Sequence, residues 1–298
     1  MQIKANGIDV EMEEAGPADG PVLLLVNGYG SQLLNWPDGF LEGLVDAGYR
    51  VIRYDNRDVG LSQKFSGAPS AKEVAATVRS GGIPSLPYTL SDMAADGIGV
   101  LDTLGIGKAH VLGVSMGGML AQLMAIEHGD RLLSLTSIMS TTGNPEVPPA
   151  TDAALAALTT PAPSEARADV IAHSIKGRRT YESPAYPKSD EELTELIGEA
   201  YDRMFYPEGT VRQYAAILGD GSRVDRLQTV RTPTLVIHGR SDNLVRVEGG
   251  IDTAKHVPGA TLQMIEGMGH DLPDALCPKF VELVREHARR AVAQEAAE

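Results

Sequence analysis

The feature that most constrains this chain is a serine between two glycines, placed where an apolar run gives way to a helical pattern. Residues 110–114 form the short apolar run, and Ser115 follows it with Gly113 and Gly117 on either side. A serine on such a strand-to-helix turn carries its hydroxyl above the edge of a sheet, in a nucleophile elbow. Glycine suits both flanking positions, because a side chain there would collide with the neighbouring strand or helix. The five-residue pattern alone is weak, so its context carries the prediction of a hydrolytic serine over a structural one.

Apolar runs alternate with helical patterns over the first 140 residues. The runs have the composition of strands buried on both faces of a parallel sheet, and they lie at 21–26, 49–54, 110–114 and 132–139. A hairpin over 3–14 precedes them, and helical spacing falls at 39–48, 91–104 and 116–128, with Ser91 as the expected N-cap of the second helix. This order predicts an α/β fold with a mostly parallel central sheet flanked by helices.

The alternation stops after the sixth strand. Residues 141–222 hold many prolines among polar helical stretches, and 189–204 has apolar residues at helical spacing. We therefore expect a helical cap, or lid, over 141–222, inserted into a core made of 1–140 and 223–298. Strands return at 233–239 and 261–265, and a helix over 277–293 ends the core. Residues 63–88 are hard to interpret, with a short helix expected at 71–79.

Composition excludes several classes of partner. The formal charge of −14 argues against nucleic acid, because phosphate binding needs clustered Lys and Arg. Cys277 is the only cysteine and no apolar segment reaches the length of a membrane span, so we expect a cytoplasmic protein. No two histidines fall at ligand spacing on one helix, and neither a metal nor a cofactor is predicted. Whether the chain forms a homo-oligomer stays open.

Two loops late in the chain carry the groups that a serine nucleophile needs. Asp242 follows the run 233–239, and His270 follows the run 261–265. Open α/β sheets gather their chemistry at the carboxyl ends of their strands, so both side chains are expected near Ser115. A neutral imidazole can take the serine proton, and a carboxylate fixes the tautomer of that imidazole. The chain order serine, acid, histidine favours these three residues as a catalytic triad.

Other titratable residues are weaker candidates. His110 and His238 lie in or at the end of apolar strands, where a hydrogen-bonded structural histidine is the expected role. Glu146 is the alternative to Asp242 as the acid, although flanking prolines make its geometry uncertain. Asp271 adjoins the histidine base, and we expect its side chain to point away, at the surface or the pocket rim.

Acyl transfer also needs donors for the negative charge that develops on the carbonyl oxygen. The backbone N–H of Met116, at the start of the helix after the elbow, is one expected donor. The second is expected from the loop after residue 26, where Gly28 allows close approach and Tyr29 N–H is the candidate. Candidates for the substrate pocket are Gly28, Trp36, Tyr181, Tyr186 and Phe205, the last three from the insert.

Several motifs together resemble the α/β-hydrolase superfamily. They are the elbow at 113–118, the loop Asn27-Gly28-Tyr29-Gly30, the segment at 54–62 and the loops of Asp242 and His270. Asn27 replaces the histidine found in many members, and Asp58 stands where a glycine is frequent, so pocket shape is expected to differ. Three further motifs, Trp36-Pro37, 52–55 and Gly267-Met268-Gly269-His270, resemble the capped esterases that include the aclacinomycin methylesterases.

The resemblance implies a serine hydrolase that acts on a carboxylic ester of a small molecule, such as the methyl ester of a bulky acid. C–C bond hydrolases and cofactor-free haloperoxidases use the same triad, and both stay open as alternatives. A non-catalytic member that only binds a ligand is a third alternative. Dehalogenases and epoxide hydrolases are disfavoured, because they need a carboxylate at the elbow, where this chain has Ser115.

Overall fold

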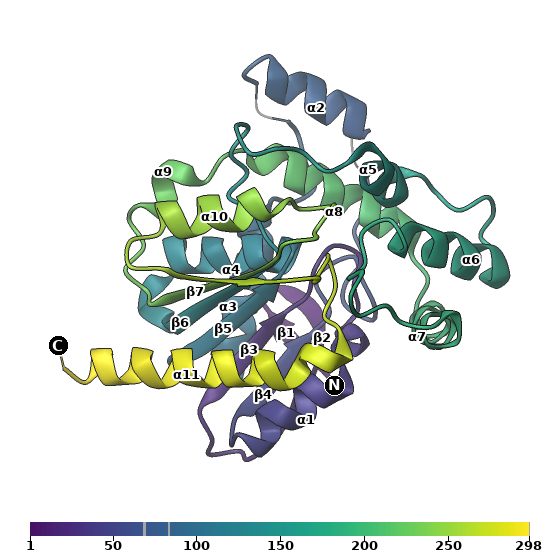
Figure 1. The fold of residues 1–298 in the computed structure, drawn as a ribbon. Coiled ribbons are helices and arrows are strands. Elements are labelled where there is room, and N and C mark those ends of the chain that lie inside the picture. The colour runs from purple at the N-terminus through teal and green to yellow at the C-terminus, as the bar shows by residue number, and fades with distance from the viewer. Residues whose placement is uncertain (68–69, 83, 298) are drawn as a thin grey trace.

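An eight-stranded sheet runs through the protein, in the order β1-β2-β4-β3-β5-β6-β7-β8 (Figure 1). The structure is a computed structural model that describes residues 1–67, 70–82 and 84–297. The strands are β1 (Gln2–Ala5), β2 (Ile8–Ala15), β3 (Val22–Val26), β4 (Arg50–Tyr54), β5 (Ala109–Val114), β6 (Leu132–Ile138), β7 (Thr234–Gly239) and β8 (Thr261–Ile265). The pairs β1–β2 and β2–β4 are antiparallel and the pairs from β4 to β8 are parallel. The predicted mostly parallel sheet is confirmed.

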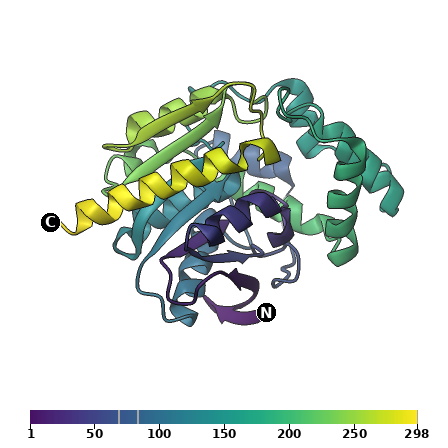
Figure 2. The same cartoon turned by 60° about the horizontal axis from the view of Figure 1, so that its bottom comes forward.

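Helices cover both faces of this sheet. One face carries α1 (Asp38–Asp46) and α11 (Cys277–Glu295), and the other carries α3 (Leu90–Thr103) and α4 (Met116–Glu127) (Figures 1 and 2). Because strand side chains alternate, Leu23 and Leu25 of β3 pack toward α1 and α11, and Leu24 packs toward α3 and α4. Burial on both faces explains why this strand is an unbroken apolar run.

The core also contains further helices and turns. They are α2 (Ala71–Arg79), which confirms the short helix expected there, α9 (Val224–Leu227), α10 (Val247–His256), and the 3-10 turns Leu33–Asn35, Gly129–Arg131 and Asp274–Leu276. Among the residues that the structure describes, no helix combines the length and the apolar character that a bilayer crossing requires.

The start of α3 differs from the prediction. Thr89, not Ser91, is the N-cap, because its side chain accepts the N–H of Asp92 while the Asp92 carboxylate accepts the N–H of Thr89. This reciprocal pair satisfies two N–H groups that a helix start leaves free. Ser91 lies in the first turn, and its hydroxyl donates to Glu127.

A helical insert follows β6, as predicted. It contains α5 (Asp152–Thr159), α6 (Arg167–Arg178), α7 (Asp190–Arg203) and α8 (Pro207–Asp220), and it lies beyond the carboxyl ends of the strands (Figure 2). The limits of this insert at residues 141 and 222, and its role as a lid, stay predictions.

Two buried ion pairs join the insert to the segment after β4. Both carboxylate oxygens of Asp58 accept from Arg212 of α8, at 2.8 and 3.0 Å. Asp55 accepts from Arg203 of α7 at 2.7 Å. Asp58 has a φ of 69°, a conformation that aspartate tolerates better than most side chains. Asp58 departs from the superfamily pattern, and it is the residue through which the core binds α8.

Candidate active site

Ser115 lies on a strained turn between β5 and α4, with a φ of 55° and a ψ of −121°. The two flanking glycines explain how the turn fits. A Cβ on Gly113 would lie 2.0 Å from the carbonyl oxygen of Gly117, and a Cβ on Gly117 would lie 2.0 Å from the carbonyl oxygen of Val26. Helix α4 therefore packs so closely on β5 and β3 that no side chain fits at either position.

The structure brings together the three residues of the predicted triad. The Nε2 atom of His270 lies 2.9 Å from the Oγ atom of Ser115, and its Nδ1 atom lies 2.7 Å from the Oδ2 atom of Asp242. Asp242 follows β7 and His270 follows β8, so the side chains converge at the carboxyl edge of the sheet. An ionised carboxylate only accepts, so Nδ1 carries the proton and Nε2 is free to accept the serine hydroxyl. This is the hydrogen-bonding order that general-base activation of a serine requires.

Asp242 stays ionised despite complete burial of its side chain. Burial alone would raise the pKa of this carboxyl, but the neighbouring His270 and His238 outweigh it and lower the pKa to about 2. The Oδ1 atom accepts the backbone N–H groups of Leu244 and Val245, each at 2.9 Å. Multiple donors to a buried carboxylate favour the charged form. These contacts hold the carboxylate in position and keep it ionised.

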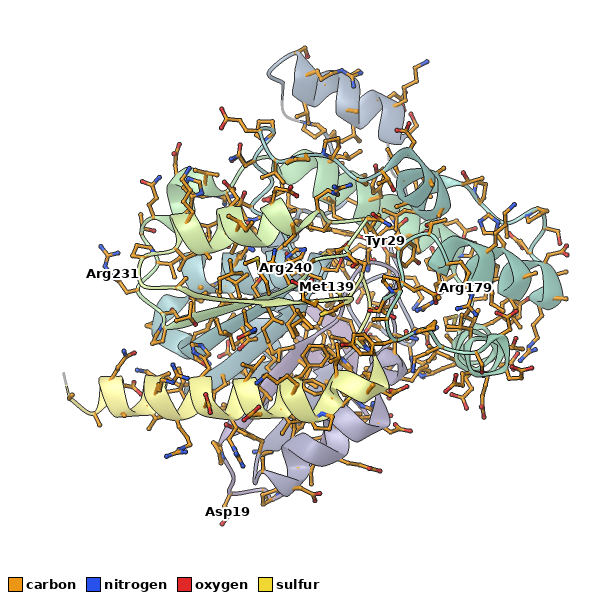
Figure 3. The ribbon with its side chains drawn as sticks, viewed as in Figure 1. Asp19, Tyr29, Met139, Arg179, Arg231 and Arg240 are labelled. Atoms are coloured by element: carbon orange, nitrogen blue, oxygen red, sulfur yellow. The ribbon has the colours of Figure 1, made fainter. Side chains whose placement is uncertain are left out.

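The glycine-containing loop after β3 passes directly beside the elbow. A Cβ on Gly28 would lie 3.3 Å from the Cβ of Ser115, and Tyr29 lies at the boundary between the sheet and the insert (Figure 3). Among the described residues, no acceptor is found for the N–H of Tyr29 or of Met116. Two free amides next to the serine can stabilise a developing oxyanion. Their role as the oxyanion hole stays a prediction.

The aromatic candidates for the pocket occupy different environments. The ring of Tyr181 lies edge-on to His270, with 6.1 Å between ring centroids. Phe205 stacks on Tyr201 within the insert, and Tyr186 is half-buried. Trp36 is 2% exposed and packs on Phe40 in the core. Of this group, Tyr181 is the one with a described contact to the triad, and substrate contact by any of them stays a prediction.

Two residues weighed beside the triad have other partners. Glu146 is exposed, and its N–H donates to the side chain of Asn144, so the structure places Asp242 and not Glu146 at the histidine. Asp271, expected at the surface or the pocket rim with its side chain pointing away, is half-buried and accepts hydrogen bonds from the N–H and hydroxyl of Ser183 in the insert.

Sequence reasoning missed the groups that hold these residues. His238 was expected to be structural, and its Nε2 atom does donate to the carbonyl of Val245 at 2.8 Å, but it also lies 3.5 Å from Asp242. Gln213 of α8 accepts the N–H of Gly30, next to Tyr29. The Gln213 contact joins segments 183 residues apart, so no local pattern indicates it, whereas both partners of His238 lie within seven residues of it in the sequence.

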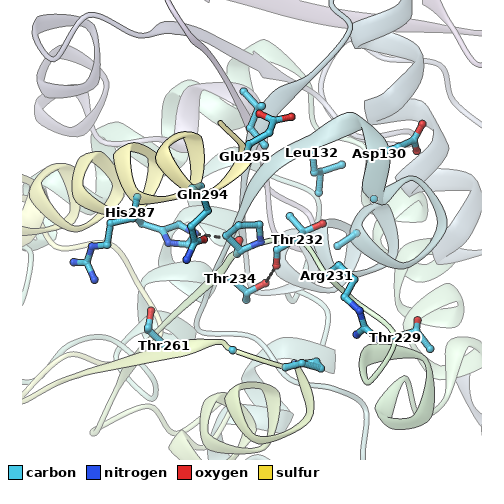
Figure 4. Close-up of a pocket in the computed structure, with 18 of the residues that line it drawn as sticks. Asp130, Leu132, Thr229, Arg231, Thr232, Thr234, Thr261, His287, Gln294 and Glu295 are labelled. Atoms are coloured by element: carbon cyan, nitrogen blue, oxygen red, sulfur yellow. Dashed lines mark hydrogen bonds between the residues drawn. The ribbon is translucent and has the colours of Figure 1, made fainter. Parts of the chain in front are cut away.

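A separate groove of about 960 Å³ lies at the opposite edge of the sheet, where β6, β7 and β8 begin (Figure 4). Its polar groups are partly satisfied by the protein itself. His287 contacts the carbonyl oxygens of Leu135 and Pro233, and the Thr234 hydroxyl donates to the carbonyl of Thr232. Charges of both signs line it, from Arg231 and Arg290 to Asp130 and Glu295. The groove contains none of the triad residues.

A strained serine, a histidine and a buried aspartate at the carboxyl edge of a largely parallel sheet define a hydrolase of the α/β class. The sequence agrees with this, because the family described as "alpha/beta hydrolase fold" matches residues 21–171. The chain belongs to the α/β hydrolase family.

The relatives include hydrolases of different kinds. Rhodomycin D methylesterase DnrP from Streptomyces peucetius is 30% identical over 92% of this chain and 93% of its own. A 2-hydroxy-6-oxononadienedioate/2-hydroxy-6-oxononatrienedioate hydrolase from Burkholderia vietnamiensis is 27% identical over 90% of this chain and 87% of its own. The chain is thus an α/β hydrolase related to methylesterases and to hydrolases of this second kind.

Solved structures share the fold. A variant of the meta-cleavage product hydrolase CumD from Pseudomonas fluorescens IP01 has a TM-score of 0.76 at 22% identity, over 98% of both chains. The esterase EaEST from Exiguobacterium antarcticum has a TM-score of 0.73 at 20% identity, over 97% of this chain and 98% of its own. At these identities, the likeness concerns the fold alone.

Proposed function

We propose that this protein is a serine esterase that cleaves a carboxylic ester through an acyl-enzyme on Ser115. The observation that carries the proposal is the unbroken path from Ser115 Oγ through the imidazole of His270 to Asp242, with distances of 2.9 and 2.7 Å. A histidine held by a carboxylate on one nitrogen, and in contact with a serine on the other, is poised to remove the serine proton.

In the first step, the Nε2 atom of His270 takes the hydroxyl proton while Ser115 Oγ attacks the ester carbonyl carbon. The N–H groups of Met116 and Tyr29 stabilise the resulting oxyanion. The intermediate collapses as the C–O bond to the alcohol breaks, and the imidazolium gives its proton to the leaving oxygen. The products of this step are the free alcohol and an acyl group on Ser115.

In the second step, water attacks the acyl-enzyme. The imidazole of His270 takes a proton from that water, the same amides hold the second oxyanion, and the acid leaves as Ser115 regains its proton. Asp242 keeps its negative charge throughout, because the pKa of its carboxyl lies near 2. Its part is to orient the imidazole and stabilise the imidazolium.

The substrate class we propose is a small-molecule ester, and in particular the methyl ester of a bulky acid. Support comes from the relatives named as rhodomycin D methylesterases, which align over most of this chain. The insert would act as a lid that excludes water and shapes the acyl side of the pocket. Tyr181, beside His270, would line that side.

The test combines a fluorophosphonate probe with a panel of esters. We expect the wild-type protein to gain one adduct on Ser115 by intact mass, and to hydrolyse p-nitrophenyl and methyl esters. Ser115→Ala should lose the adduct and lower kcat by roughly 10³- to 10⁶-fold without loss of fold. Labelling without turnover of any ester or of a 2-hydroxy-6-oxo-dienoate would favour a binding protein, and ester turnover by Ser115→Ala would reject Ser115 as the nucleophile.

C–C bond hydrolysis is the second candidate, because one relative is named for oxononadienedioate hydrolysis. Such an enzyme would cleave a vinylogous diketone and leave simple esters nearly untouched. The same preparation should therefore be assayed on a 2-hydroxy-6-oxo-dienoate. A kcat/KM at least about 100-fold above that for the best ester would replace the esterase proposal with this one.

A further inference from the structure

The loop that carries His270 is bound to the insert at three consecutive residues. The N–H of Gly269 donates to the hydroxyl oxygen of Ser183 at 2.8 Å, and the N–H of His270 donates to the carbonyl of Tyr181 at 2.7 Å. The N–H of Ser183 donates to Asp271 at 3.1 Å, and the Ser183 hydroxyl donates to the same carboxylate oxygen. The histidine is therefore held from both sides by one short segment between α6 and α7.

Residues 181–185 of the insert approach the histidine loop so closely that no side chain would fit at the glycines of that loop. A Cβ on Gly269 would lie 2.4 Å from the carbonyl oxygen of Glu182, and one on Gly267 would lie 2.4 Å from the Cβ of Ala185. The contact thus extends over the glycines that precede the histidine. The contact is mainly between the two backbones, and Ser183 adds a side chain from the insert.

The Ser183 hydroxyl is the centre of this contact. Ser183 is 0% exposed, and its oxygen accepts from the residue before the histidine while its proton goes to the residue after it. Burial raises the pKa of the Asp271 carboxyl, and the hydrogen bonds from Ser183 oppose that rise. Loss of the hydroxyl would leave the buried N–H of Gly269 without its partner and remove a side-chain link between Gly269 and Asp271. A buried N–H without an acceptor costs free energy that water does not restore.

We infer that Ser183, on the insert, is a positioning residue that sets the catalytic histidine in the core, an inference that rests on the proposed esterase function. His270 must keep Nδ1 on Asp242 and Nε2 on Ser115 at once, so a small shift of its backbone lengthens at least one hydrogen bond. Displacements of about 1 Å at a reacting group cost roughly 100-fold in rate. The insert would then hold the catalytic histidine in position in addition to covering the site.

A role in packing alone predicts something different. If Ser183 only helped to seat the insert, its loss would alter the pocket and hence KM for large esters. It would leave intact the reactivity of Ser115 toward a small probe. The rate of fluorophosphonate labelling therefore separates the two roles, because it depends on activation of Ser115 by His270 and not on recognition of a bulky acyl group.

The test compares Ser183→Ala with Ser164→Ala, a matched control. Ser164 is also in the insert and also bonded to an aspartate, Asp169, but it is exposed and its bonds are local. We expect Ser183→Ala to lower kcat and the labelling rate constant together, by about 10- to 100-fold, with KM within about threefold of wild type. Ser164→Ala should match wild type in all three. A folded Ser183→Ala protein that is labelled at the wild-type rate would overturn the inference.

A second pair of variants covers the case in which Ser183→Ala does not fold. Asp271→Asn keeps an oxygen that accepts from Ser183 and should stay within about threefold of wild type, whereas Asp271→Ala should lose about tenfold or more. Equal labelling rates for these two would also reject the inference. Failure of the proposed function looks different, because the wild-type protein itself would then carry no adduct on Ser115.

Discussion

Gln213 of helix α8 accepts the backbone N–H of Gly30 at 2.9 Å, so the insert also holds the loop that contains Tyr29. The Nε2 atom of the same side chain donates to the carbonyl of Arg57 at 2.9 Å, and the residue is fully buried. One amide side chain thus joins the loop after β3 to the loop after β4. The position of the Tyr29 N–H depends on a residue more than 180 positions away.

Replacing Gln213 should therefore weaken stabilisation of the oxyanion. Gln213→Met preserves length but loses both hydrogen bonds, and we expect kcat to fall about tenfold while KM changes by less than about threefold. Steady-state kinetics on a p-nitrophenyl ester measure this, with the exposed Gln228→Met as a control. A raised KM at unchanged kcat would assign Gln213 to substrate binding instead.

Asp242→Asn should keep the fold and lose most of the activity. The amide can donate to Nδ1 and favour the wrong imidazole tautomer, so kcat should fall by about 10³- to 10⁴-fold. In the wild-type protein the pKa of Asp242 is lowered to about 2. Its ionisation therefore stays constant from about pH 4 upward, and activity lost as the pH falls toward 4 should not trace to this carboxyl. An activity profile that follows a carboxyl group would contradict this assignment.

Close packing of the elbow predicts a sharp contrast between two glycines. Gly113→Ala would place a Cβ 2.0 Å from the Gly117 carbonyl oxygen, whereas Gly107 has no atom within 4 Å of its would-be Cβ. We expect Gly113→Ala to lower the free energy of unfolding by about 3 kcal/mol or more, or to prevent folding. Gly107→Ala should change it little. Urea denaturation of both variants measures the difference, and equal midpoints would show that the elbow can relax.

Loss of one partner from the buried ion pair of Asp58 and Arg212 should lower the free energy of unfolding. Among the described residues, Arg212→Met leaves the buried Asp58 carboxylate with the hydroxyl of Tyr88 as its one side-chain donor, and we expect a loss of about 3–5 kcal/mol in unfolding free energy. Adding Asp58→Asn removes the unpaired charge and should restore part of that loss. Breaking the exposed pair of Arg290 and Glu286 is the control, and it should have little effect. A double variant less stable than Arg212→Met would contradict the expected coupling.

The buried imidazole of His110 should make the folded protein less stable in mild acid. Burial, with a smaller contribution from His287, lowers its pKa to about 4, and its Nδ1 atom lies 2.8 Å from the Ser134 hydroxyl. The unfolded chain takes up a proton at this position near pH 6.5, and the folded protein does so only near pH 4. The folded state therefore loses roughly 3 kcal/mol as the pH falls between those values.

A neutral replacement at this site tests the linkage. His110→Asn can keep a polar atom near Ser134 but does not titrate, so its unfolding free energy should fall less steeply between pH 6.5 and 4. Urea midpoints measured across this interval for both proteins give the comparison. Parallel curves would mean that other groups cause the acid sensitivity.

Local patterns in the sequence were sufficient to predict the sheet and that Ser115, Asp242 and His270 lie together at its edge, and their role as a catalytic triad stays a prediction. The apolar run before Ser115, its two glycines, and the loops after β7 and β8 each carry a signal that depends on near neighbours alone. The N-cap of α3 lies two residues before the predicted one. Thr89 and Ser91 are both good caps, but only Thr89 has an acidic residue three positions on, Asp92, to complete a capping box. That spacing is visible in the sequence and would have decided the choice.

The partners of the triad could not be predicted in the same way. For Asp271 the sequence predicts a place at the surface or the pocket rim but no partner, because its donor Ser183 lies 88 residues away. Gln213 likewise acts through contacts that exist only once the insert is folded against the core, whereas His238 lies within seven residues of both its partners. The reactive atoms follow from local rules, and the residues that hold them follow from tertiary structure.

Because the insert contacts both the Gly30 loop and the histidine loop, it cannot be exchanged as an independent module. A chimera that carries the corresponding helices of a homologue would change its substrate range and its turnover number at the same time. New specificity in this protein would then evolve more readily by substitutions inside the existing helices than by replacement of the whole insert. Ser183 and Gln213, which bind the two loops, would be retained.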